Sequence, residues 1–149
     1  MTHQRRLTIA DDDGKHIMAA YVESDACGFE GADLSGLCAP LIRNLRGRSF
    51  GRAILYWANL HGADLSGCNF EAADLRGADL EDAILVGANL RNAKLGCDNL
   101  GGATHLKGAD LTQAQLHGAD LRGAMYDGRT TFPAGFDPQV AGCLDADTS

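Results

Sequence analysis

The sequence predicts an all-β solenoid, a chain that winds into stacked coils with a corner in every repeat. Two observations carry this prediction. A leucine or phenylalanine occurs at every fifth position from residue 45 to residue 100, and the series resumes after a slip of one residue. A small residue, usually alanine, stands two places before most of these centres. An internal repeat of fixed period indicates the architecture before any single motif does.

The centres of the repeats are expected to form the core. In chain order they are Phe29, Leu34, Leu45, Phe50, Leu55, Leu60, Leu65, Phe70, Leu75, Leu80, Leu85, Leu90, Leu95, Leu100, Leu106, Leu111, Leu116, Leu121 and Tyr126.

A period of five fits neither of the common regular structures. A helix needs apolar residues every three or four positions, and a step of five would spread the leucines around all sides. In a flat strand the side chains alternate, so a step of five would send successive leucines to opposite faces. A chain that turns a corner in every repeat keeps all the centres pointing toward one axis.

The repeats resemble those of the pentapeptide-repeat family, whose motif is close to Ala-(Asp/Asn)-Leu-x-Gly. Clear copies are Ala63-Asp64-Leu65-Ser66-Gly67 and Ala119-Asp120-Leu121-Arg122-Gly123, and the match covers roughly residues 27–128. The resemblance implies a right-handed quadrilateral β-helix with four repeats in each coil and about five coils. It also implies that the centre and the small residue two places before it face inward.

The segments outside the repeats are expected to cap the two ends of the solenoid. In residues 1–26, two apolar runs flank the turn-forming sequence Asp11-Asp12-Asp13-Gly14, which predicts a hairpin arm. Residues 129–149 are predicted to form a capping segment and a mobile tail, with Phe132 and Phe136 covering the last coil. Open coil ends expose apolar side chains and backbone edges, so solenoids need such caps.

Two slips interrupt the repeat, each of one extra residue. One lies around Pro40 and the other between Leu100 and Leu106. We expect small bulges at corners, too short to project. Asp98 occupies an inward small-residue position, and a local distortion beside Gly101-Gly102 would explain it. With four repeats in each coil, one face would carry the centres Phe29, Phe50, Phe70, Leu90 and Leu111.

Composition indicates one acidic domain of 149 residues with a formal net charge of −7. We expect no membrane span and no secretory signal, because no stretch has the necessary apolar length. The five cysteines include no Cys-x-x-Cys pair, which favours reduced thiols in a cytoplasmic compartment.

No enzyme signature occurs in the sequence. There is no phosphate-binding loop, no His-Glu-x-x-His and no Gly-x-Ser-x-Gly. His61, His105 and His117 show no metal-ligand spacing with the cysteines. We therefore predict a non-enzymatic protein without a cofactor or metal.

An aromatic group is the first candidate for a protein contact. Ile54, Tyr56 and Trp57 take outward positions of their repeats, and exposed aromatics are enriched at interfaces. The expected contact, with an unknown partner protein or a second copy of the chain, includes nearby arginines. The alternative is that the N-terminal arm covers the aromatic residues, and a dimer could also form through an end coil. The arginines are Arg43, Arg46, Arg48, Arg52 and Arg76.

The arginines before residue 53 lie in a stretch without acids. They predict either an anion-binding patch or a solvated, irregular first coil. Arg43 and Arg48 occupy inward positions, and we expect both side chains to turn outward because an unpaired buried guanidinium is costly.

Acidic residues provide the alternative site. The candidates are Asp64, Glu71, Asp74, Asp79, Glu81, Asp82 and Asp120. Some members of the resembled family imitate B-form DNA and bind type II topoisomerases, so the alternative function is a DNA mimic that binds gyrase or topoisomerase IV.

Several features count against mimicry. The face predicted from Asn59, Asp79, Asn99 and Asp120 is only half charged, and we expect no long projecting loop. Lysines and arginines also interrupt the surrounding surface. Direct nucleic-acid binding is not favoured for so acidic a chain. A third reading is a structural module without a dedicated partner.

Overall fold

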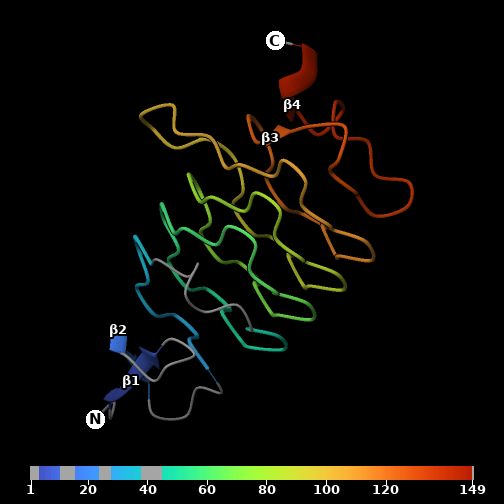
Figure 1. Cartoon of the computed structure of the whole chain (residues 1–149). Helices are drawn as coiled ribbons and strands as arrows, with labels where there is room; N and C mark the ends of the chain where they lie inside the picture. Colours follow the sequence, from blue (N-terminus) through green and yellow to red (C-terminus); the bar gives the residue numbers. More distant parts are fainter. Residues whose placement is uncertain (1–3, 11–15, 24–27, 38–44, 149) are drawn as a thin grey trace.

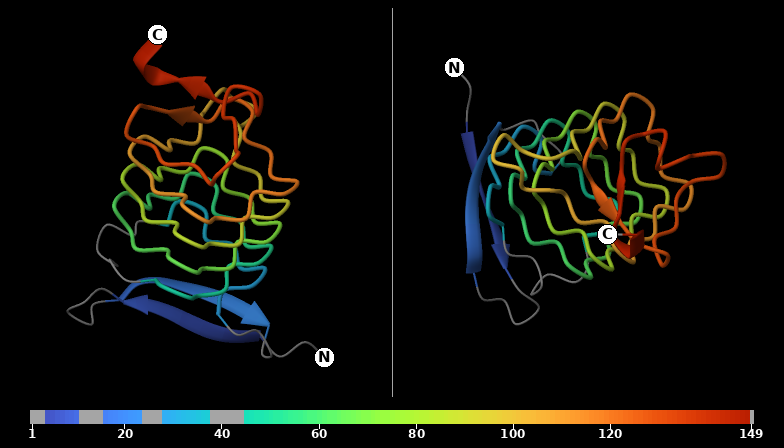
Figure 2. Two further views of the ribbon diagram at one scale, coloured as in Figure 1. Left: turned by 90° about the vertical axis from the view of Figure 1, so that its right-hand side faces the viewer. Right: turned by 90° about the horizontal axis from the view of Figure 1, so that it is seen from above.

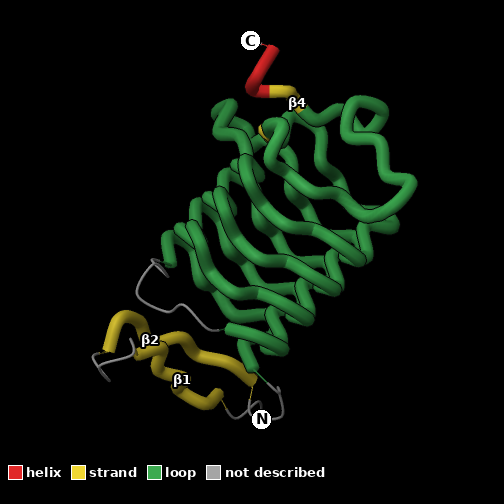
Figure 3. The backbone as a smooth tube through the Cα atoms, turned by 45° about the vertical axis from the view of Figure 1, so that its right-hand side comes forward, coloured by secondary structure: helices red, strands yellow, loops and turns green. Residues whose placement is uncertain are grey.

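The computed structural model describes residues 4–10, 16–23, 28–37 and 45–148. Its main body is a column of four-sided coils that rise along one axis, with the two termini at opposite ends (Figure 1). The coils consist of turns and isolated bridges, and the strands lie at the two ends (Figure 3). Among the described residues, none of the helices has the length and hydropathy needed to cross a bilayer.

Each coil has four sides, and single-residue parallel bridges link each side to the same side of the next coil. We name each face after one of its bridge residues. The Asn69 face holds Ser49, Asn69, Asn89 and Gln115; the Asp74 face holds Ile54, Asp74, Lys94 and Asp120; the Asp79 face holds Asn59, Asp79, His105 and Met125; the Ile84 face holds Asp64, Ile84, Asp110 and Thr131.

The core is a continuous stack of the predicted centres. Leucines such as Leu55, Leu75 and Leu95 are fully buried, as are the alanines two places before them. Behind the Asn69 face, the rings of Phe29, Phe50 and Phe70 stack with centroid separations of 5.3 and 5.0 Å.

The next members of that stack correct the sequence prediction. Leu90 follows the phenylalanines, and its amide donates to Gln115, the bridge residue that precedes Leu116. Leu116 therefore completes the column, and Leu111 lies behind the Ile84 face instead. The prediction was wrong because it allowed for one extra residue after Leu100. In the structure Leu106 is the next core centre after Leu95, so six residues are extra to the five-residue repeat.

The extra length forms a loop, residues 97–103, that leaves the coil and projects from it (Figure 1). Before the loop, successive bridge residues on one face are 20 or 21 positions apart, as for Asn69 and Asn89, but His105 pairs with Asp79, which is 26 positions earlier. Leu100 is 89% exposed on this loop. The expectations of a small, non-projecting bulge and of an inward Leu100 were therefore wrong.

The chemistry of two side chains explains why the loop leaves the core. An inward Asp98 would place a carboxylate among leucines, at a high desolvation cost. Thr104 takes the inward small-residue place instead and is fully buried. Its hydroxyl lies 3.0 Å from the carbonyl oxygen of Leu75 and 3.1 Å from that of Gly96, so its single proton is shared between the two. The contact with Gly96 closes the neck of the loop.

The N-terminal arm is a two-stranded antiparallel hairpin, as the sequence predicts. Strand β1 spans Gln4–Ala10, and strand β2 spans His16–Glu23. The hairpin lies across the N-terminal end of the coils (Figure 2). The predicted turn at residues 11–14, the slip around Pro40 and Arg43 all fall outside the described residues.

The C-terminal segment returns to the last coil. Strand β3 (Met125–Tyr126) pairs in parallel with strand β4 (Leu144–Asp145), and a short 3-10 helix η1 (Ala146–Thr148) follows. Phe132 stacks on Phe136 at 5.1 Å, and both pack against the core as predicted. Leu144 and Asp145, which pair here, lie in residues 139–149, the stretch for which the sequence predicts a mobile tail.

Candidate interaction site

Trp57 occupies a corner position where most repeats have glycine. Its φ of 57° lies in the left-handed region, which is unfavourable for a bulky residue. One coil further on, the same corner position holds Gly77. A Cβ on Gly77 would lie 3.2 Å from indole atoms Cδ2 and Cε2, so glycine allows the ring to lie against the backbone.

The 97–103 loop contacts another edge of the same indole. A Cβ on Gly102 would lie 2.5 Å from Cζ2 and 2.6 Å from Cη2 of Trp57. Trp57 is still 51% exposed. The ring thus packs against the loop along one edge and leaves the rest of its aromatic surface exposed to solvent.

Asp98 fixes the shape of the loop. Its side chain is buried, and Oδ1 accepts hydrogen bonds from the backbone N–H groups of Leu100 at 2.8 Å and Gly102 at 2.6 Å. Oδ2 has no hydrogen-bond partner among the described residues. Burial acts to raise the pKa of Asp98, but the two N–H groups, with the side chains of Tyr56 and Trp57, outweigh burial and lower it.

Tyr56 and Arg76 continue this cluster onto the Asp74 face. The Arg76 guanidinium lies 5.5 Å from the centre of the Tyr56 ring, a cation–π geometry. Arg76 also donates to both oxygens of Asp74, at 2.8 and 2.6 Å. Burial acts to raise the pKa of Asp74, but this fork-shaped pairing lowers it. The Tyr56 and Trp57 rings meet edge to face at 6.4 Å.

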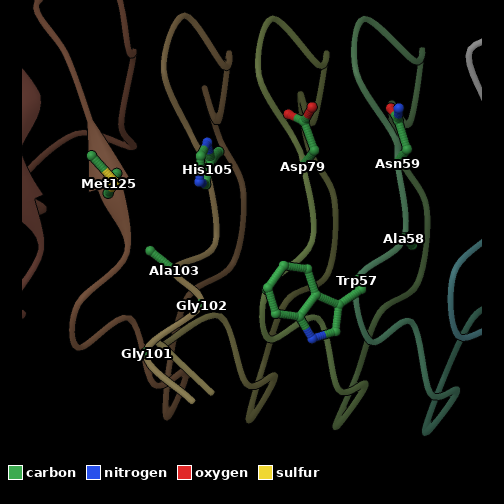
Figure 4. Close-up of a pocket in the computed structure, with 10 residues that line it drawn as sticks. Trp57, Ala58, Asn59, Asp79, Gly101, Gly102, Ala103, His105 and Met125 are labelled. Atoms are coloured by element: carbon green, nitrogen blue, oxygen red, sulfur yellow. The ribbon is translucent and has the colours of Figure 1, made fainter. Parts of the chain in front are cut away.

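A groove of about 410 Å³ runs along the Asp79 face beside these residues. Asn59, Asp79, His105 and Met125 form a row in it, with Trp57 and the stretch Gly101–Ala103 along one edge (Figure 4). The groove therefore offers one carboxylate and one imidazole next to an aromatic wall.

The other predicted contact residues are placed on several sides. Ile54 is 43% exposed on the Asp74 face. Arg46 pairs with Asp64 of the Ile84 face at 3.3 Å. Arg48 is exposed, as expected, and Arg52 lines a separate hollow with Glu71 and Asn69. Within the described part of the chain, only Arg76 of the predicted arginines adjoins the aromatic pair.

The acidic residues are distributed over different faces and corners. Asp64, Asp74 and Asp120 form ion pairs with Arg46, Arg76 and Arg122, in that order, and Lys94 lies 4.0 Å from Asp74. Arg122 donates to both carboxylate oxygens of Asp120, and these bonds lower the pKa of Asp120 to about 2.

The predicted acidic column does not exist in the described chain. After Asn59 and Asp79, the column continues with His105 and Met125. Asn99 is in the loop, and Asp120 bridges to Lys94 on the Asp74 face. Glu81 and Asp82 lie beside Arg129, at 3.9 and 2.9 Å, while Glu71 lies at another corner.

Comparison with known proteins accounts for the four-sided coils. The family model for pentapeptide repeats matches eight copies, at residues 53–92 and 102–124. A pentapeptide repeat protein from Nostoc Pcc 7120 is 34% identical over 74% of this chain and 98% of its own, with a TM-score of 0.47. A pentapeptide repeat protein from the thylakoid lumen of Arabidopsis thaliana is 32% identical over 75% of this chain and 74% of its own, with a TM-score of 0.54. The chain belongs to the pentapeptide-repeat family.

The pentapeptide-repeat assignment implies a right-handed β-helix, in agreement with the resemblance noted from the repeat motifs. The interval between the two matched stretches, residues 93–101, overlaps the 97–103 loop. No curated protein matches the sequence. QnrB1, a plasmid-mediated fluoroquinolone resistance protein, is 18% identical with a TM-score of 0.27, a likeness too weak to bear on function.

Sequence reasoning missed two parts of this site. Leu100 fitted the repeat and was assigned to the core. The groove was also missed, since it lies between the loop and the Asp79 face and needs both to form. The charge of Asp98 two places before Leu100 was the available signal for both.

Proposed function

We propose that the protein is a non-enzymatic interaction module that binds a partner protein through the Trp57 surface. This surface comprises Ile54, Tyr56, Trp57, Arg76 and the 97–103 loop. The observation that carries the proposal is Leu100, an exposed leucine on a projecting loop that is docked against a half-exposed tryptophan. Large apolar side chains grouped on a surface are typical of protein contacts.

Rigidity supports the same proposal. Binding is weakened when loops and side chains must be ordered on contact. Here the bonds of Asp98 to Leu100 and Gly102 shape the loop, and Thr104 closes its neck. Burying an exposed leucine against a partner is worth roughly 1.5–3 kcal/mol, and little of that free energy would be lost to ordering.

The charges favour a partner of a particular kind. Asp79 lies in the groove next to Trp57, and the chain has a net charge of −7. We therefore propose a partner surface that presents an apolar side chain surrounded by basic residues. We also propose a cytoplasmic setting, in keeping with the free thiols of Cys68, Cys97 and Cys143.

The test compares two exposed apolar residues, one inside the proposed contact surface and one outside it. Leu100→Ser removes the apolar side chain of the loop, and Val140→Ser makes the same kind of change at a C-terminal residue that is 85% exposed. Wild type and both variants are used to capture proteins from host lysate, and the captured protein is then purified and its Kd measured. We expect Leu100→Ser to weaken binding by about tenfold or more, which corresponds to ~1.4 kcal/mol, and Val140→Ser to leave it unchanged.

The contrary outcome is equal binding by all three proteins, which would remove the Trp57 surface as the contact. A second copy of the chain is the competing occupant, so sedimentation of the three proteins alone is measured as well. A dimer that Leu100→Ser dissociates would identify self-association in place of a different partner. No captured protein and no dimer would favour a structural module without a dedicated partner.

DNA mimicry toward gyrase or topoisomerase IV is the second candidate function. One observation favours it, the projecting loop, because such loops are associated with that subgroup. The spread of the acids over several faces, with most of them in ion pairs, counts against it. The test is supercoiling by purified gyrase, with and without a quinolone, at micromolar protein. Inhibition or protection would support mimicry, and we expect neither.

A further inference from the structure

One corner of the solenoid gathers an imidazole and two carboxylates from two successive coils. Ligand atoms of His61, Asp79 and Glu81 all lie within 4.8 Å of one another. We propose that these three side chains form a binding site for a divalent transition-metal ion of the Zn²⁺ class. The site lies where the Asp79 face meets the next corner, and it is separate from Leu100 and Ile54.

The repeat geometry brings the three side chains together. His61 and Glu81 each follow a core leucine, so they hold the same place in successive coils, and the amide of Gly62 donates to the Glu81 carbonyl at 2.9 Å. Coils stack about 4.8 Å apart, which sets the imidazole over the carboxylates. Asp79 stands two places before Glu81, and its Oδ1 accepts the Glu81 N–H at 3.0 Å, which fixes the position of its carboxylate.

The donor set selects the class of ion. Zn²⁺ binds histidine nitrogen at about 2.0–2.1 Å and carboxylate oxygen at about 2.0–2.2 Å, with a water completing four-fold coordination. Ligand atoms around one such ion therefore lie within roughly 4 Å of each other, so the observed cluster needs only small side-chain rotations. The imidazole separates this cluster from an ordinary acidic patch, because Ca²⁺ and Mg²⁺ prefer oxygen ligands alone.

The neighbouring basic side chains, Arg129 and Lys107, do not occupy the proposed metal site. The guanidinium of Arg129 lies 3.9 Å from Glu81, but its close bonds go to Asp127 and to Asp82, each at 2.9 Å. Lys107 takes the next place in the column after Glu81, and no ion pair within 4.0 Å joins the two among the described residues. His61 is exposed and both carboxylates are partly exposed, so an ion can enter from solvent.

The experiment uses Zn²⁺ and Co²⁺ as probes on the full chain. Zn²⁺ is titrated by calorimetry in a non-chelating buffer. Co²⁺ is followed by its visible absorption and by quenching of Trp57, the single tryptophan, which lines the same groove as Asp79. We expect one ion per chain, with Co²⁺ absorption of a low-coordinate site, quenching of Trp57 and displacement of Co²⁺ by Zn²⁺.

A matched histidine makes the test specific. His61→Ala removes a ligand, and His117→Ala removes an exposed histidine at the same repeat position on another corner, after Leu116. We expect His61→Ala and Glu81→Gln to lower the affinity at least about tenfold and His117→Ala to leave it unchanged. Absence of 1:1 binding by wild type, or equal loss in both histidine variants, would overturn the site. Neither result depends on the partner proposed above.

Discussion

The regular coils of residues 45–95 and the 97–103 loop carry the same sequence period but take opposite positions in the molecule. In the coils, a leucine such as Leu75 follows Ala73 and both are buried. In the loop, Leu100 follows Asp98 and is exposed. The difference teaches that a centre enters the core together with the residue two places before it, so that the pair is the unit that packs.

Arg48 shows how that rule can be relaxed. It stands two places before Phe50, yet Phe50 is buried while Arg48 is exposed. A long, flexible arginine can reach solvent from an inward position along its methylene stem. Aspartate has a single methylene and cannot. The repeat around Asp98 therefore leaves the column of leucines, and its carboxylate is buried within the loop, where Oδ1 accepts two backbone N–H groups.

The largest expected effect compares the two leucines directly. Leu75→Ala should lower the free energy of unfolding by about 2–5 kcal/mol, because it removes a fully buried side chain from a close-packed column. Leu100→Ala should change it by less than about 0.5 kcal/mol, because the side chain already faces water. Urea unfolding measures both values. Similar losses from the two variants would show that Leu100 belongs to the core after all.

The next effect tests the docking of the loop on Trp57. A methyl group on Gly102 would lie 2.5 Å from the indole, so Gly102→Ala should displace the ring or the loop. Overpacking of this kind costs about 1–3 kcal/mol, and the emission of Trp57 should shift to longer wavelength as the ring gains water.

The control is Gly128→Ala, where the nearest atom to the added methyl is a carboxylate oxygen of Asp147 at 3.2 Å. This variant should leave the emission of Trp57 unchanged. An unchanged spectrum in Gly102→Ala would mean that loop and indole are not in contact.

A smaller effect is expected from the neck of the loop. Thr104→Val keeps the buried shape but removes the hydroxyl that bonds to the carbonyls of Leu75 and Gly96. We expect a loss of about 1 kcal/mol and faster proteolysis or amide exchange within residues 97–103. Thr112→Val is the control, because the hydroxyl of Thr112 bonds to Asp110 on the exposed surface. Equal protection of the loop in both variants would exclude a role for the neck.

The smallest effect is a local response to acid. The pKa of Asp98 is lowered on folding from its ordinary value of 3.8, so its contribution to loop stability is present above that pH and is lost as pH falls through the folded pKa. Trp57 emission, followed from about pH 6 to about pH 2, should report release of the loop in that window. Asp98→Asn should flatten the response. A wild-type curve identical to that of the variant would contradict this account.

The period predicts a coil, because the inward leucines recur so regularly that neither a helix nor a flat strand would bury them. The right-handed, four-sided form was implied by the resemblance to the pentapeptide-repeat family. The path after residue 95 could not be predicted in the same way. There, Leu100 fits the period, but Thr104 satisfies its hydroxyl in the core while Asp98 would not satisfy its charge. Periodicity counts apolar residues and takes no account of the cost of the polar residue next to them.

The candidate site was harder to predict than the fold, since it depends on contacts between coils. Tyr56 and Trp57 were correctly assigned to outward-facing positions, and Arg76 adjoins them as expected. Among the other described arginines of the prediction, Arg46 pairs with Asp64 and Arg52 lines a separate hollow. His61 and Glu81 are far apart in sequence and adjacent in space, so no short motif reveals them. Only the register of the stacked coils, once known, brings such residues together.

The closed neck between Gly96 and Thr104 gives the solenoid a position where chain can be added without disturbing the stack. Both ends of the loop are held in place by the core, and the free energy of closing a loop rises only slowly with its length. A foreign peptide grafted between Asn99 and Gly101 would be displayed on a rigid stem, with the coils before and after it kept in register. The 97–103 loop is therefore the place where peptide can be inserted with the least disturbance of the stacked coils.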